Sequence, residues 1–148
     1  MKWKSQAIDG TGETFVVPAN EGLGVANNAP TAAVTLGAGD SGKTIMLNAA
    51  EGFAITLPAP VAGLKYKFLV AAAFATTNFT VVTDSGDNVI QGGAIVNSVF
   101  VPAANEDTIN FVATAETIGD YVVIESDGTN WLAEGVGAAS GAITFTAS

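Results

Sequence analysis

Short runs of β-branched and aromatic residues recur along the chain, separated by Gly, Asn, Asp and Pro. Almost none of these runs is long enough for a helix, and the rhythm is typical of a β-sandwich or a β-barrel. We therefore predict an all-β fold, with single helical turns at most, at 71–73 and 102–105. Twelve strands are expected, at 13–18, 32–36, 43–48, 53–58, 64–71, 79–83, 88–91, 94–99, 108–114, 121–126, 131–134 and 142–146.

Strict alternation marks one of these strands most clearly. In the segment 64–68, Leu64, Tyr66 and Phe68 alternate with two lysines. Because successive side chains of a strand point to opposite faces, the three apolar residues share one face and the lysines share the other. This pattern predicts a strand with one buried face and one solvent-exposed face.

Turn signals divide the expected strands. Asp127-Gly128 lies between the apolar runs 121–124 and 131–132, and an Asp-Gly pair in that position is a strong hairpin signal. A second turn is expected at 84–88. The segment 58–63 contains two prolines and predicts a rigid connection that no helix crosses.

The first 30 residues differ from the rest of the chain. Apart from the apolar run 14–17 they hold scattered Gly, Asn, Pro and Glu, and cannot bury enough surface to fold alone. We therefore predict an extended N-terminal arm at 1–30, followed by a β-sandwich or barrel-like domain at 31–148.

Charge and composition exclude several classes of function. The 148 residues include 5 Lys and Arg against 14 Asp and Glu, a net charge of −9, which is the wrong sign for binding nucleic acid. There is no Cys and no His, which excludes disulfides, thiolate or imidazole metal sites, and nucleophiles that depend on Cys or His. We expect no cofactor, no metal and no enzymatic activity.

Hydrophobic residues make up 49% of the chain and charged residues only 13%. Two explanations stay open: a surface rich in Thr, Ser, Asn and Gly, or apolar surface buried between subunits. The longest apolar run, 68–75, is far shorter than the ~20 residues of a membrane span, so no membrane partner is expected. The segment 1–6 is charged and polar with no apolar region behind it, so we expect no secretory signal.

The sharpest motif is a match to the phosphate-loop pattern G-x-x-x-x-G-K-[ST] between Gly37 and Thr44. That chemistry needs a helix N-terminus behind the loop, with the lysine on the terminal phosphates and the threonine on Mg²⁺. The residues that follow end in the strand-like run 53–57 and leave no room for such a helix. We therefore interpret the segment as a Gly-rich loop between strands and expect a structural role for Lys43.

Paired carboxylates are the other candidates for chemistry, because two carboxylates can hydrolyse glycosides without His or Cys. Each pair lies where solvated turn residues normally occur, so we expect turn roles, with adventitious calcium at 84–88 or 127–130 as the alternative. The pairs are Glu125 with Asp127, Asp84 with Asp87, and Glu106 with Asp107.

Two tryptophans stand apart from the expected core. Trp131 follows the hairpin turn and is interpreted as an edge or interface aromatic rather than a platform for sugars. Trp3 lies between Lys2 and Lys4 in the arm, where two readings stay open: a disordered residue, or an anchor that fills a pocket in a partner.

Four segments resemble runs that recur in small virion proteins of tailed bacteriophages, including head decoration (cement) proteins and tail-fibre modules. The resemblance covers roughly 37–135 and is a style of β-hairpin sequence rather than a catalytic signature. The segments are GDSGKTIML at 39–47, GFAITLPAP at 52–60, GLKYKF at 63–68 and GDYVVIESDGTNW at 119–131.

This resemblance implies a non-enzymatic structural protein that decorates and stabilises the outer surface of a bacteriophage capsid, often as a homotrimer. Its partners would be the major capsid protein and further copies of itself, and it would be made in the bacterial cytoplasm. A tail-fibre or other virion attachment module is the alternative. The expected capsid or subunit contacts are Lys2, Trp3, Lys4, Phe15, Val16, Val17 and Trp131.

Overall fold

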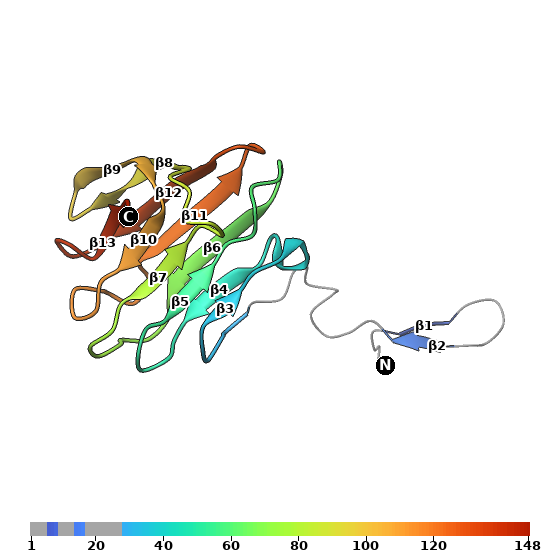
Figure 1. Cartoon of the computed structure of the whole chain (residues 1–148). Coiled ribbons are helices and arrows are strands. Elements are labelled where there is room, and N and C mark those ends of the chain that lie inside the picture. Colours follow the sequence, from blue (N-terminus) through green and yellow to red (C-terminus); the bar gives the residue numbers. More distant parts are fainter. Residues whose placement is uncertain (1–5, 9–13, 17–27) are drawn as a thin grey trace.

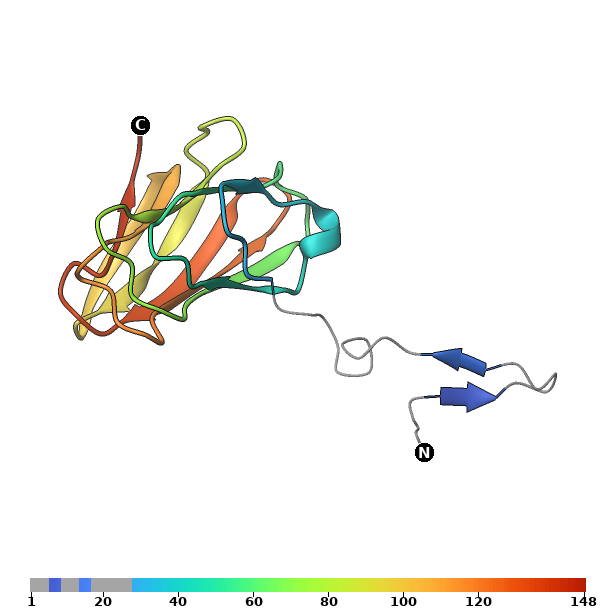
Figure 2. The same ribbon diagram turned by 90° about the horizontal axis from the view of Figure 1, so that it is seen from below.

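The computed structural model describes residues 6–8, 14–16 and 28–148, which form two large sheets packed face to face and one small sheet (Figures 1 and 2). The six-stranded sheet has the order β4 (Thr44–Leu47), β6 (Lys65–Val70), β11 (Tyr121–Ser126), β12 (Trp131–Gly137), β8 (Ile90–Val96) and β9 (Val99–Glu106). The five-stranded sheet has the order β13 (Ile143–Thr146), β10 (Thr108–Phe111), β7 (Phe79–Val82), β5 (Ala54–Thr56) and β3 (Val34–Thr35).

The all-β prediction is confirmed, and within the described residues the helical structure is a single short 3-10 turn, η1 (Ala38–Asp40). None of these residues belongs to a helix long and apolar enough to cross a membrane. Two strand assignments were wrong. β8 is one continuous strand where two were expected, and the unpredicted strand β9 covers 102–105, where a single helical turn at most was allowed. No helical turn forms at 71–73 either. Pro102 is compatible with β9 because this strand lies at the edge of its sheet, where a missing N–H leaves no neighbour unpaired.

The chain crosses repeatedly from one sheet to the other. From β3 to β7 each strand lies in the opposite sheet from the one before, so β3, β5 and β7 pair in parallel in one sheet and β4 and β6 in the other. Parallel strands need a crossover connection, which is usually a helix. Here a strand of the opposite sheet supplies the crossover, which explains how a chain with short connections contains parallel pairs.

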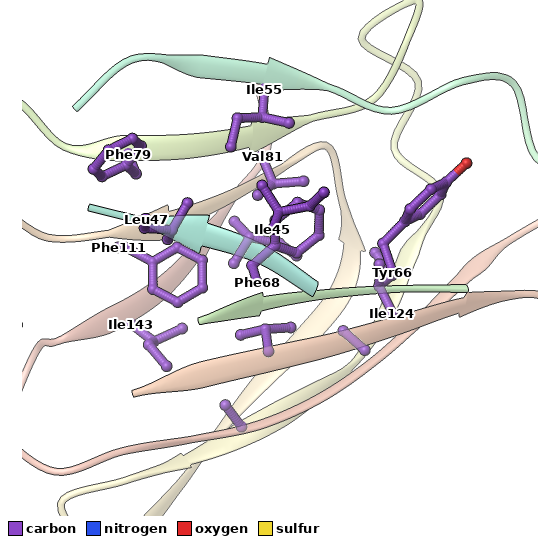
Figure 3. Packing of buried hydrophobic residues seen from close by; sticks show 14 of the residues in the cluster. Ile45, Leu47, Ile55, Tyr66, Phe68, Phe79, Val81, Phe111, Ile124 and Ile143 are labelled. Carbon is purple, nitrogen blue, oxygen red and sulfur yellow. The ribbon is translucent and has the colours of Figure 1, made fainter. Parts of the chain in front are cut away.

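Alternation places one face of each sheet in a shared core (Figure 3). In β6, Tyr66 and Phe68 are fully buried while Lys65 is exposed, as the alternation predicted. Leu64, just before the strand, is buried as well. Ile55 and Val81 face them from the five-stranded sheet (Figure 3).

The hairpin expected at Asp127-Gly128 joins β11 to β12. One Oδ of Asp127 accepts hydrogen bonds from the N–H groups of Thr129 and Asn130, at 2.8 and 2.7 Å. Gly128 has φ +100°, a conformation that favours glycine. The turn residues therefore fix the register of the two strands, with Ser126 opposite Trp131.

Near the N-terminus, β1 (Gln6–Ile8) and β2 (Thr14–Val16) pair as a small antiparallel sheet (Figure 1). The strand expected at 13–18 is thus confirmed in its centre, and its partner β1 was not predicted. The pairing of the larger body reaches back to Asn28, which forms a bridge with Ile45. The division into an arm at 1–30 and a domain at 31–148 stays a prediction.

Replacing Gly52 with alanine should destabilise the fold, because the connections before β5 and β7 touch there. A Cβ on Gly52 would lie 2.2 Å from the carbonyl carbon of Asn78, so backbone has to move. We expect Gly52→Ala to lower the free energy of unfolding by about 1–3 kcal/mol, as overpacked sites do. Urea unfolding monitored by fluorescence measures this loss.

Gly39→Ala is the matched control, because a Cβ there has no atom within 4 Å. The control should leave the unfolding midpoint within about 0.5 kcal/mol of the parent chain, as for a surface change. Equal effects of the two substitutions would contradict the close approach at Gly52.

Candidate functional site

The outer face of the six-stranded sheet carries an unbroken line of apolar side chains. The register brings one residue from each strand into a single row perpendicular to the strands, and we call it the apolar row. From β4 to β9 in spatial order it consists of Met46, Leu69, Tyr121, Val136, Ile95 and Phe100.

Exposure increases along the row toward β9. Met46, Leu69 and Tyr121 are half-buried, whereas Val136 and Ile95 are each 44% exposed and Phe100 is 57% exposed. Large apolar side chains that are exposed and contiguous mark interaction surfaces more often than isolated ones do. The β12, β8 and β9 end of the row is therefore the most open part of this surface.

Local contacts hold two aromatic rings of the row in place. A Cβ on Gly93 would lie 2.7 Å from Cζ of Phe100, so the ring occupies the space that a side chain at position 93 would need. The ammonium group of Lys67 lies 4.9 Å from the centre of the Tyr121 ring, within the range of a cation–π contact. Both rings are thus positioned by residues of neighbouring strands.

The remainder of this face combines balanced charges with apolar side chains, among them Leu132, which is 47% exposed. The next row contains Lys67, Val123 and Glu134, and the row beyond it contains Lys65 opposite Glu125. A shallow depression of about 330 Å³ lies over these two rows. It is lined by Lys65, Val123, Glu125, Ser126, Asp127, Leu132 and Glu134.

We call residues 28–148 the body, and two of its three lysines lie on this face. Residues 28–148 include three lysines and eleven Asp and Glu. Lys65 and Lys67 lie on the outer face, whereas Lys43 forms an ion pair with Asp40 at 2.7 Å. The two lysines of the face stand with two glutamates, so the negative charge of the body accumulates elsewhere.

The segment that matches the phosphate-loop pattern is a loop between β3 and β4, as predicted. Thr44 is the first residue of β4 rather than of a helix. Hydrogen bonds within the loop stabilise it. Asp40 accepts hydrogen bonds from Lys43 Nζ at 2.7 Å and from the Gly37 N–H at 3.0 Å. The Lys43 hydrogen bond, followed by that of Gly37, holds the pKa of Asp40 below its ordinary value. Lys43 therefore has the structural contact that the sequence predicted.

At least one member of each carboxylate pair accepts hydrogen bonds in a turn or at a strand end. Hydrogen bonds from the N–H groups of Asn130 and Thr129 lower the pKa of Asp127, and Asp87 accepts a hydrogen bond from Ser85. Burial tends to raise the pKa of Asp107, but hydrogen bonds from Ser148 and Thr108 outweigh it and the pKa is lowered.. Across residues 28–148, His, Cys, Asp and Glu form no group of three or more that could hold a metal ion.

The expectation that Trp131 is an edge or interface aromatic is wrong. Its side chain is fully buried, 5.8 Å from the Tyr66 ring between ring centres. The reason is the hairpin register, which puts Trp131 opposite the buried Ser126 on the inner face of the sheet. The core, and not a partner, therefore receives this indole.

The other expected contacts belong to the N-terminal segment. Phe15 and Val16 lie in β2, opposite Ala7 and Gln6 of β1. The remaining four fall outside the described residues. They are Lys2, Trp3, Lys4 and Val17.

Sequence reasoning missed the exposed end of the apolar row. Phe100 belongs to β9, which was not predicted, and Val136 lies beyond the expected end of the strand at 131–134. The apolar run at 99–101 was an available signal for a strand. The row itself becomes visible only when the order of the strands is known.

Comparisons of this chain with protein-family models, with curated proteins and with solved structures found no match.

We expect Mg-ATP and Mg-GTP not to bind the loop between Gly37 and Thr44. No helix dipole stands behind its N–H groups, and Asp40 places a carboxylate beside Lys43. Calorimetric titration of the parent chain should give no binding heat. Asp40→Asn, which releases Lys43, should give none either. A micromolar dissociation constant that disappears in Lys43→Ala would contradict this.

Proposed function

We propose that this chain is a structural, non-enzymatic virion protein that decorates and stabilises the outer surface of a bacteriophage capsid, as a homotrimer. The observation that carries the proposal is the apolar row, which crosses all six strands of an exposed sheet face. A surface of this kind suits protein–protein contact. The resemblance of 37–135 to small phage virion proteins supplies the context in which such contact is made.

The use of the polar side chains supports a structural role. Asp40, Asp107 and Asp127 each accept hydrogen bonds that close a loop, a strand end or a turn. Lys43 contacts Asp40, and Lys67 lies over an aromatic ring. These groups stabilise the sandwich, and the tight loops they close suit a protein whose task is to remain folded on a particle.

The N-terminal arm is the proposed contact with the capsid. A two-stranded sheet is marginally stable in water, so β1 and β2 gain from a third strand. Addition of the pair to a sheet edge of the major capsid protein would provide that strand. Lys2 and Lys4 would give the arm a positive tip that suits an acidic shell, and Trp3 would fill a pocket there.

Copy number on the particle tests the proposed function. Virions whose genome encodes this chain should carry it in hundreds of copies, because a shell protein repeats with the capsid lattice. Quantitative mass spectrometry of purified virions, with the major capsid protein as internal standard, gives the ratio. A handful of copies would favour the tail-fibre or attachment module, and absence from the particle would contradict a virion role.

Deleting residues 1–17 should abolish binding to undecorated capsids and leave the oligomer intact. Co-sedimentation with capsids measures the first effect, and sedimentation velocity of the free protein measures the second. As a control, Val61→Lys in the body should retain binding to the capsids. Dissociation of the deletion variant into monomers would assign the arm to subunit assembly instead, and unchanged capsid binding would assign the contact to the body.

A further inference from the structure

We propose that the apolar row is the surface on which a second copy of this chain docks. The inference rests on the proposed homotrimer and assigns its subunit contact to particular residues. The open end of the row, at Val136, Ile95 and Phe100, forms the centre of the contact. The two neighbouring rows, which mix charged residues with Val123 and Leu132, form the rim.

The opposite face of the sandwich shows that the row is not a consequence of composition. The outer face of the five-stranded sheet is formed mainly by Thr and Asn, with Val82 and Ala54 as its apolar members, and its strands carry no charged residue there. In spatial order its two rows are Thr146, Thr108, Val82, Thr56 and Thr35, and Thr144, Asn110, Thr80 and Ala54. A sheet face in contact with water is ordinarily polar in this way. The six-stranded sheet departs from that pattern along one complete row.

Charge favours a copy of the same chain as the occupant. The body is strongly acidic, so most approaches of two copies bring like charges together. The outer face of the six-stranded sheet is the exception, because Lys65 and Lys67 balance Glu125 and Glu134 there. Two copies meeting at this face can place a lysine of each near a glutamate of the other. This face has no excess of positive charge, so it offers no electrostatic attraction to an acidic capsid surface.

The size of the face is sufficient for a stable contact. Six strands spaced about 4.8 Å apart, and three rows about 6.8 Å apart, give a face of roughly 600 Å². A stable interface takes about 600–1,000 Å² from each partner. In a trimer each face is shared between the two neighbouring subunits, and three such faces around a common axis bury roughly 1,800 Å² in total, within the range of a stable assembly. The area therefore reaches the lower end of what an oligomer needs.

Val136→Lys tests the proposal, with Val61→Lys as its matched control. Val61 is 58% exposed and lies in the connection before β6, near the hairpin end of the sheet and away from the row. We expect Val136→Lys to weaken self-association by at least about 30-fold, as loss of an interface hot spot does. Val61→Lys should leave it unchanged. Sedimentation equilibrium of purified chains gives both constants, and circular dichroism confirms that each variant is folded.

Ile95→Thr provides a second variant that keeps a β-branched side chain in β8, and it should also weaken self-association. A monomeric parent chain at micromolar concentration, or equal effects of the two lysine variants, would overturn the proposal. So would a Val136→Lys chain that remains oligomeric but no longer binds undecorated capsids, because the shell would then cover the row. These measurements use the purified chain and need no virion. A failed copy-number test would therefore contradict the virion role without contradicting the proposed docking surface, and a failed self-association test would contradict the docking surface without contradicting the virion role.

Discussion

Packing of two sheets onto one shared apolar layer is the constraint on which the rest of this structure depends. Residues 28–148 contain one short 3-10 turn and otherwise only strands and connections, so neither sheet has a helix to cover it. Most strands therefore bury every second side chain against the opposite sheet, as Phe68 and Val81 do, whereas the edge strand β9 buries only Ala103. The same alternation points the intervening side chains outward. Both outer faces of the sandwich are therefore available for contact with water or with another protein.

Local signals in the sequence were sufficient for most of the strands and turns, but not for β1 and β9 or for the way the strands assemble. The alternation at 64–68, the Asp127-Gly128 turn and the loop after Gly37 were predicted correctly, because each depends on near neighbours. Trp131 was placed on the wrong face because the run 121–124 is apolar throughout and does not reveal which side is inward. The apolar row depends on the parallel pairing of β8 with β12, which no local pattern encodes.

The two outer faces of the sandwich differ in chemistry: one is polar and uncharged, and the other carries the apolar row. The threonine-rich face presents hydroxyl and amide groups without charge, as expected for a surface in contact with water. The opposite face combines the apolar row with balanced Lys and Glu side chains, as expected for a surface that meets a copy of itself. Under the proposed function, subunit contact would belong to residues 28–148 and capsid binding to the arm, and apolar surface buried between subunits would account for the sparse charge of the chain.

The most direct test is whether solvent reaches the row in the assembled protein. The chain has no cysteine, so a single cysteine at position 95 or 61 can be labelled uniquely. We predict that Ile95→Cys reacts with a maleimide much more slowly in the oligomer than after dilution to monomers, while Val61→Cys reacts equally fast in both. Equal reactivity of Ile95→Cys in the two states would show that the row stays open to solvent and would contradict the account.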